Sequence, residues 1–293
     1  MDSLFSYRVF GLCVLSSFPI GFIATQSNLE KDAIKICPWD GFLETINSSQ
    51  KICFQLPKVG TFQVVDGQFV YCCPDMNQSL SNGFISVTLL GACMGAILHQ
   101  RGEFILHGSC VTRGDKTILV TGVSGAGKST LAAEFLRNGW EMVTDDIALI
   151  KGIEEGHPMV QSSYPSQKLW EDAITRYNIA PDKQTLLYTE DNRSKVNVHI
   201  DHFHEGLSPL TDIVCLYPTE KECDIIPVTG IAIVDQLMRN TYRPYMIPES
   251  QRQHHFQRCV TLSKQIRMHA VLRTRDRDTA PELYEKIIQA TED

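Results

Sequence analysis

The first part of the chain alternates apolar and polar residues over short stretches. Thr61–Val65 and Gln68–Tyr71 have the period of two that is typical of a strand with one buried face, and clusters of Gly, Asn and Pro separate such stretches. At Gly83 the pattern changes to a long apolar run, Phe84–Leu98. This change predicts a small β-rich domain over residues 1–82 and a larger domain over residues 83–293.

Two apolar runs could be mistaken for membrane segments. Leu12–Ile23 lacks a basic segment before it and contains Pro19, so we expect one or two strands there. Phe84–Leu98 is shorter than the roughly 20 apolar residues that span a bilayer, so we expect a buried helix that packs against the sheet of the larger domain. The sequence therefore predicts no membrane partner and a cytoplasmic location.

Beyond Gly83, strand and helix patterns follow one another, as in an α/β fold. The predicted strands are Phe104–Ser109, a hairpin over Val111–Val120, Trp140–Thr144, Ile147–Ile150, Thr211–Tyr217, Asp224–Val228 and Ile266–Leu272. The predicted helices are Leu131–Asn138, Ser166–Tyr177, Gly230–Asn240 and Pro281–Ala290.

The segment between the hairpin and the first of these helices has the spacing G-x-x-x-x-G-K-[ST] of a Walker A loop. The predicted nucleotide-binding residues are Gly122, Val123, Ser124, Gly125, Ala126, Gly127, Lys128, Ser129 and Thr130. The glycines allow backbone N–H groups to converge on phosphate oxygens, and the helix N-terminus adds partial positive charge. Lys128 would reach the β- and γ-phosphates of ATP, and the Ser129 hydroxyl would ligate Mg²⁺.

A pair of carboxylates, Asp145 and Asp146, directly follows the strand predicted after this helix. A helix of about eleven residues rises roughly 16 Å, and a strand of about five residues returns over a similar distance. Both carboxylates should therefore lie at the phosphate end. One carboxylate could help to hold Mg²⁺ while the other accepts the proton of an acceptor hydroxyl, as phosphoryl transfer requires. Asp145 is the predicted metal ligand if Asp146 is the proton acceptor. The hairpin could bring His107 back to the same place.

Composition restricts the class of partner. The 293 residues have a formal net charge of −7, so the chain lacks the basic excess of a nucleic-acid-binding protein. Ten scattered cysteines without a C-x-x-C pair are expected to be mostly free thiols.

Three segments, LHGS at Leu106, GVSGAGKST at Gly122 and VTDD at Val143, resemble in order and spacing the catalytic core of the HPr kinase/phosphorylase family. The resemblance implies a P-loop kinase core of the HPr kinase/phosphoenolpyruvate carboxykinase type, which transfers phosphate from ATP to a protein serine. It implies that His107 is the active-site histidine, Lys128 the P-loop lysine, Ser129 a Mg²⁺ ligand and Asp146 the proton acceptor, with Asp145 as its supporting neighbour.

The chain departs from that family after the carboxylates. The family's metal-binding glutamate and glycine-rich segment are replaced by SYPSQKLWEDA, in which Glu171 could stand in as a metal ligand. This segment, with YRVFGL, LLGACMGAIL, NRSK and RNTYRPY, resembles the HPr-kinase-like proteins encoded with lasso peptide biosynthesis. That resemblance implies a precursor peptide with a C-terminal serine as acceptor. Arg193 and Arg243 could hold the carboxylate of such a peptide or the transferring phosphate.

The sequence thus predicts an ATP- and Mg²⁺-dependent serine kinase that acts on a peptide or protein and could form a homo-oligomer. Two alternatives remain open. The same core could phosphorylate a small molecule, or it could be a regulatory nucleotide-binding module that transfers no phosphate.

Overall fold

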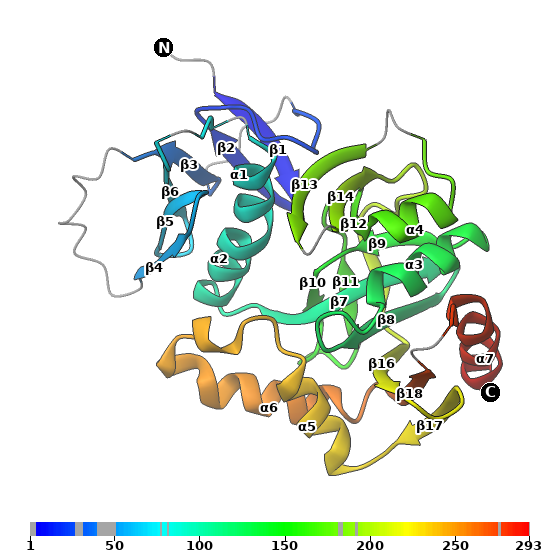
Figure 1. Cartoon of the computed structure of the whole chain (residues 1–293). Coiled ribbons are helices and arrows are strands. Elements are labelled where there is room, and N and C mark those ends of the chain that lie inside the picture. The colour runs from blue at the N-terminus through cyan, green and yellow to red at the C-terminus, as the bar shows by residue number, and fades with distance from the viewer. Residues whose placement is uncertain are drawn as a thin grey trace.

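The computed structural model describes residues 4–26, 32–39, 51–76, 78–80, 82–180, 184–190, 193–274 and 277–292. Over these residues the strands form three sheets, which helices flank in a mixed α/β arrangement (Figure 1).

The N-terminal sheet has six strands in the order β1-β2-β3-β6-β5-β4. Their bounds are Phe5–Val9, Leu12–Ser16, Ile34–Pro38, Lys51–Leu56, Gly60–Val65 and Phe69–Pro74 for β1 to β6. β5 and β6 cover the two stretches whose alternation predicted strands, but in β5 every residue except Thr61 is buried, including the polar Gln63.

The helical segment Gly83–Gln100 covers this sheet and comprises three consecutive parts. They are α1 (Gly83–Thr88), a π-helical turn η1 (Leu89–Cys93) and α2 (Met94–Gln100). By length and composition the segment could cross a membrane, but 83% of it is buried inside the protein. Its apolar side chains share one core with the N-terminal sheet and with Ile105 and Ile147 of the next sheet, so it joins the two parts of the fold. The domain boundary between residues 82 and 83 remains a prediction.

The central sheet contains the P-loop strand. Its order is β15-β11-β10-β7-β8-β16-β18-β17, and β9 pairs with β7 off this path. The strands are β7 (Phe104–Arg113), β8 (Lys116–Gly122), β9 (Glu141–Thr144), β10 (Ile147–Lys151), β11 (Met159–Gln161), β15 (Leu207–Pro209), β16 (Asp212–Thr219), β17 (Asp224–Val228) and β18 (Arg267–Thr274). The predicted hairpin is present, with β7 and β8 antiparallel and joined at residues 114–115. β8, β16 and β18 run parallel, so their carboxyl ends lie at one edge, next to the P-loop.

Helices pack around the central sheet: α3 (Lys128–Arg137), α5 (Ile231–Arg239), α6 (Arg252–Leu262) and α7 (Ala280–Glu292), with 3₁₀ turns η3 (Pro244–Met246) and η4 (Glu249–Gln251). α3, α5 and α7 agree with the predicted helices to within a few residues. α6 had no clear apolar stripe and was not predicted.

The helix predicted over residues 166–177 is wrong in its first half. Ser166–Trp170 is the strand β12, and only Glu171–Arg176 is helical, as α4. β12 pairs with β14 (Arg193–His199), which also pairs with β13 (Gln184–Glu190), to form the third sheet. The pairing with β14 supplies backbone hydrogen bonds that a local pattern cannot show, and these override helix propensity.

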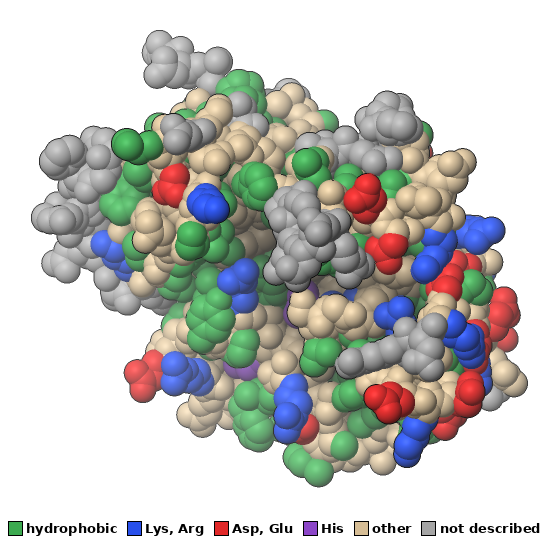
Figure 2. All heavy atoms as spheres, viewed as in Figure 1, with side chains coloured by type: hydrophobic (Ala, Val, Ile, Leu, Met, Phe, Trp, Pro, Cys, Tyr) green, Lys and Arg blue, Asp and Glu red, His purple; other side chains and the backbone are tan. Residues whose placement is uncertain are grey.

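All ten cysteines are free, as predicted. On the face shown in Figure 2, described Lys and Arg side chains are interspersed with Asp and Glu over the region of α3 and α7.

Candidate active site

The P-loop has the backbone that its glycines permit. Gly122, Gly125 and Gly127 have φ values of 134°, 77° and 98°, a region that other residues rarely adopt. A Cβ on Gly122 would lie 2.6 Å from the carbonyl oxygen of Leu216 on β16, so this position also requires the absence of a side chain. The loop leads directly into α3, whose first residue is Lys128. Backbone N–H groups and a helix N-terminus therefore meet where phosphates are expected.

The Lys128 side chain folds back onto its own loop. Its Nζ donates hydrogen bonds to the carbonyl oxygens of Gly122 and Val123, at 2.9 and 3.0 Å, and the residue is buried. Burial lowers the pKa of Lys128, and the charges of Asp145 and Asp146 oppose that effect. To reach a phosphate, the ammonium group would exchange these carbonyl oxygens for phosphate oxygens.

Asp145 lies beside the predicted Mg²⁺ ligand. Its Oδ1 accepts hydrogen bonds from Ser129 Oγ at 3.2 Å and from Ser109 Oγ at 2.5 Å, and its Oδ2 accepts from the backbone N–H of Lys168 at 2.9 Å. A hydroxyl and a carboxylate at the mouth of a P-loop are the hard oxygen ligands that Mg²⁺ takes together with substrate phosphates. This donor set fits the predicted ion.

The third predicted metal ligand, Glu171, is exposed and does not line the cavity at the P-loop, whereas its neighbour Asp172 does. Among the residues described here, no group of three or more His, Cys, Asp and Glu could hold a metal ion. A Mg²⁺ ion held by Ser129 and Asp145 would take its other ligands from phosphate oxygens and water, as Mg²⁺ commonly does.

Asp146 is held in a left-handed conformation, with φ of 76°, between two cationic or potentially cationic side chains. Its Oδ2 lies 2.7 Å from Lys168 Nζ, and its Oδ1 lies 3.3 Å from His107 Nδ1. Burial alone would raise the pKa of Asp146, but the charge of Lys168 and the hydrogen bond and charge of His107 lower it well below the usual range. The carboxylate is therefore ionised in this arrangement.

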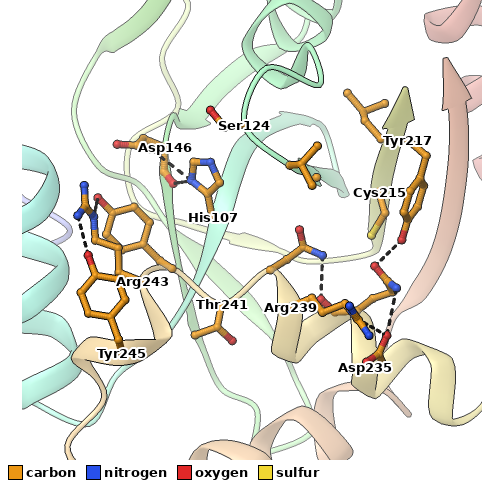
Figure 3. A pocket seen from close by; sticks show the side chains of 16 residues that line it. His107, Ser124, Asp146, Cys215, Tyr217, Asp235, Arg239, Thr241, Arg243 and Tyr245 are labelled. Carbon is orange, nitrogen blue, oxygen red and sulfur yellow. Dashed lines mark hydrogen bonds and ion pairs between the residues drawn. The ribbon is translucent and has the colours of Figure 1, made fainter. Parts of the chain in front are cut away.

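Two cavities meet at this carboxylate. The P-loop cavity, of about 550 Å³, is lined by Lys128, Ser129, Thr130, Asp145 and Lys168 among others. The α5 cavity, of about 870 Å³ and drawn in Figure 3, lies between the start of the P-loop, the end of β16 and the segment from α5 to η3. Both are lined by His107, Ser124, Asp146 and Arg243. No local pattern in the sequence predicts the α5 cavity.

The segment after α5 is hydrogen-bonded to β7. The backbone N–H of His107 donates to the carbonyl oxygen of Asn240 at 2.7 Å, and the N–H of Tyr242 donates to that of Ile105 at 3.1 Å. The buried Tyr242 carbonyl oxygen also accepts a hydrogen bond from His99 Nε2 at 2.6 Å. These bonds place residues 240–243 directly beside His107.

Of the two arginines predicted to bind substrate, Arg243 lies at the junction of the cavities. Its Nε donates to the hydroxyl of Tyr242 at 3.3 Å, and its Nη1 donates to the hydroxyl of Tyr245 at 2.9 Å. Figure 3 marks the bond to Tyr245 with a dashed line. Arg193 starts β14, and its side chain lies outside the described residues.

Two residues at the site were not predicted from the sequence: Lys168 and Tyr242. Both belong to segments quoted for the family resemblance, YPSQKLWEDA and RNTYRPY, but neither carried a role there. Their proximity to Asp146 depends on the β12–β14 pairing and on the contact of residues 240–242 with β7, which no local pattern reveals.

Glycines on the helical segment make room for these side chains. A Cβ on Gly91 would lie 3.6 Å from Asp146 Oδ2, 3.7 Å from Tyr242 Oη and 3.8 Å from Lys168 Nζ. A Cβ on Gly95 would lie only 2.4 Å from Cε1 of the Tyr242 ring. The π-helical turn thus forms one wall of the site, as such turns often do.

No family model matches the chain, and no curated protein matches it. Among solved structures, the chain is similar to the HPr(Ser) kinase/phosphatase from Coxiella burnetii, with 14% identity and a TM-score of 0.35. That similarity covers 64% of this chain and 95% of the other. The assignment of function therefore depends on the geometry of the site.

Proposed function

We propose that the protein is a kinase that transfers the γ-phosphoryl group of ATP to a hydroxyl group in a Mg²⁺-dependent reaction. The observation that carries this proposal is the meeting of two cavities at His107 and Asp146. A nucleotide-binding module needs the P-loop cavity alone. A kinase also needs a second space on the far side of the γ-phosphate, because the acceptor attacks roughly in line with the leaving group.

The direction of the P-loop supports this division of space. Lys128, Ser129 and Thr130 line only the P-loop cavity, whereas Gly122 and Val123, at the start of the loop, line only the α5 cavity. The polyphosphate would follow the loop, with Ser129 and Asp145 holding Mg²⁺. When bound there, Mg²⁺ would neutralise charge that develops on the phosphate oxygens.

In the proposed reaction Asp146 accepts the acceptor's proton. Its carboxylate faces both cavities, so a hydroxyl in the α5 cavity could reach it. His107 holds the carboxylate in place through Nδ1, which also lies 3.0 Å from the Asp146 carbonyl oxygen. The strained backbone of Asp146 is consistent with a functional position.

For the acceptor we propose a peptide serine, most specifically the C-terminal serine of a lasso peptide precursor. The concave α5 cavity favours a flexible chain end over a serine on a folded surface. Arg243 donates hydrogen bonds from Nε and Nη1 to phenolic hydroxyls, and its guanidinium group has the fork geometry to pair with a terminal carboxylate. Arg193 is proposed as a second anchor on the resemblance alone.

A small-molecule acceptor is the second candidate, because the volume of the α5 cavity, 870 Å³, lies within the range of small-ligand sites, about 300–1,000 Å³.

The peptide acceptor is tested with a synthetic peptide that ends in serine, its C-terminal amide and a version extended by one residue. Each peptide is incubated with the protein, Mg²⁺ and ATP, and mass spectrometry measures the added phosphate. The proposal predicts rapid phosphorylation of the free acid only. Equal rates for all three peptides, or modification of a folded carrier protein alone, would exclude the chain-end acceptor.

A further inference from the structure

Lys168 occupies a fixed position beside the P-loop. Its backbone N–H donates to Asp145 Oδ2 at 2.9 Å, and the adjacent Gln167 side chain donates to the carbonyl oxygen of Ser129 at 2.8 Å. β12 is thereby attached both to the carboxylate pair and to the start of α3. The backbone of Lys168 is thus held by Asp145, a predicted Mg²⁺ ligand, and the neighbouring Gln167 is held by the first turn of α3.

The Lys168 ammonium group lies beside Asp146, the carboxylate at which the two cavities meet. The side chain is 14% exposed, lines the P-loop cavity and places Nζ 2.7 Å from Asp146 Oδ2. The distances from Gly91 show that Nζ, Asp146 Oδ2 and Tyr242 Oη surround one point on the wall of the site. Lys168 therefore differs from a surface lysine that pairs with a carboxylate in water.

Lys168 also differs from the P-loop lysine. Lys128 bonds to carbonyl oxygens at the base of its loop, whereas Lys168 is bound to the carboxylate that would accept the proton. If Asp146 is within reach of the acceptor hydroxyl, the phosphoryl group under attack is also within reach of Lys168. A cation at that place would stabilise charge on the phosphoryl oxygens.

We propose that Lys168 is a catalytic residue that binds the transferring phosphoryl group in the transition state. The inference rests on the proposed kinase function. As the acceptor oxygen forms its bond to the γ-phosphorus, the bond from phosphorus to the β,γ-bridging oxygen breaks, and ADP leaves with that electron pair. The acceptor's proton passes to Asp146. The Lys168 ammonium group, 2.7 Å from Asp146 Oδ2, would pair with the phosphoryl oxygens as these bonds form and break.

The test compares two ligands in variants of the full chain: Mg²⁺ with ADP, and Mg²⁺ with ADP and aluminium fluoride, which mimics the phosphoryl group in transfer. Lys168→Met should bind Mg·ADP within about threefold of wild type but lose about 10²–10³-fold of its affinity for the fluoride complex, the usual effect of removing one transition-state contact. Lys168→Arg should recover part of that loss. Lys151→Met, which removes a lysine paired with Glu103 away from both cavities, should bind both ligands as wild type does.

A merely structural Lys168 would give a different result. Equal affinities of Lys168→Met and wild type for the fluoride complex, or equal losses for both ligands, would overturn the inference. If Lys168→Met does not fold, Asp146→Asn/Lys168→Met removes both charges of the pair and is compared with Asp146→Asn alone. The same additional loss for the fluoride complex is expected, and its absence would also overturn the inference. Failure of wild type to bind Mg·ADP would instead reject the proposed function itself.

Discussion

Gly95 and Gly91 offer a sharp test of how the helical segment shapes the site. A methyl group on Gly95 would lie 2.4 and 2.8 Å from Cε1 and Cδ1 of Tyr242, closer than real contacts allow. The ring cannot easily retreat, because Tyr242 is buried and its backbone is bonded to Ile105 and His99. Gly95→Ala must therefore displace residues 241–243.

The magnitude follows from two opposing terms. Overpacking a filled core costs about 1–3 kcal/mol, and replacing glycine by alanine in a helix returns up to about 1 kcal/mol. Because the added Cβ would lie 2.4 Å from the ring, we take the upper part of the first range, about 2–3 kcal/mol. After a return of about 1 kcal/mol, Gly95→Ala should lower the free energy of unfolding by about 1–2 kcal/mol. At Gly91, where the nearest atoms are 3.6–3.8 Å from an added Cβ, the same change should be neutral or stabilising.

Urea denaturation of both variants measures these differences, and the double variant Gly95→Ala/Tyr242→Ala tests their origin. If the clash with the ring is the cause, the double variant should have nearly the same free energy of unfolding as Tyr242→Ala alone. Gly95→Ala should also weaken phosphate transfer, because Arg243 moves with Tyr242. A Gly95→Ala protein as stable as wild type, or a cost that persists without the ring, would refute the reasoning.

Three further predictions follow from the site and the core. Lys128→Ala should abolish phosphate transfer in a folded protein, as circular dichroism and a transfer assay would show together; wild-type turnover would reject its role. Asp146→Asn should retain nucleotide affinity and lose about 10²–10⁴-fold in rate, whereas Asp145→Asn should act through its Mg²⁺ dependence; equal, metal-rescuable defects would refute this division. Burial, with the neighbouring charges, lowers the pKa of His255 from 6.5 to about 4. Between pH 6.5 and about pH 4, His255 is therefore protonated in the unfolded chain and neutral in the folded chain. The free energy of unfolding should therefore fall as pH drops through this window, by about 3 kcal/mol from this group, and His255→Gln should flatten that part of the stability curve; an unchanged slope would contradict it.

Local signals were enough to predict the P-loop, the return of the two carboxylates and the hairpin that carries His107. Each lies within one strand–turn–helix or strand–turn–strand unit, where glycines and apolar periodicity determine the path. Local patterns did not predict α6, and after Tyr164 they predict a helix where the structure has the strand β12. Leu169 of that segment shares an apolar cluster with Ala133 of α3, and Lys168, Leu169 and Trp170 all line the P-loop cavity. This placement depends on the pairing of β12 with β14.

The second half of the site is assembled from distant parts of the chain. Lys168, Tyr242 and Gly91 come from three elements, and each is brought to Asp146 by tertiary contacts. Contacts between residues so far apart in the chain cannot be predicted from local spacing in the sequence. The α5 cavity was missed for the same reason, because its walls belong to the P-loop, β16 and residues 235–245.

In the proposed reaction the γ-phosphoryl group passes from ATP in the P-loop cavity to a hydroxyl group in the α5 cavity. Mass spectrometry of a serine-ending peptide, incubated with Mg²⁺, ATP and either wild type or Asp146→Asn, tests it most directly. We expect wild type to add one phosphoryl group to the terminal serine and the variant to do so at a rate at least about 10²-fold lower. Binding of Mg·ATP without transfer to the peptide, to a folded carrier protein or to a panel of small hydroxyl compounds would contradict the proposed reaction.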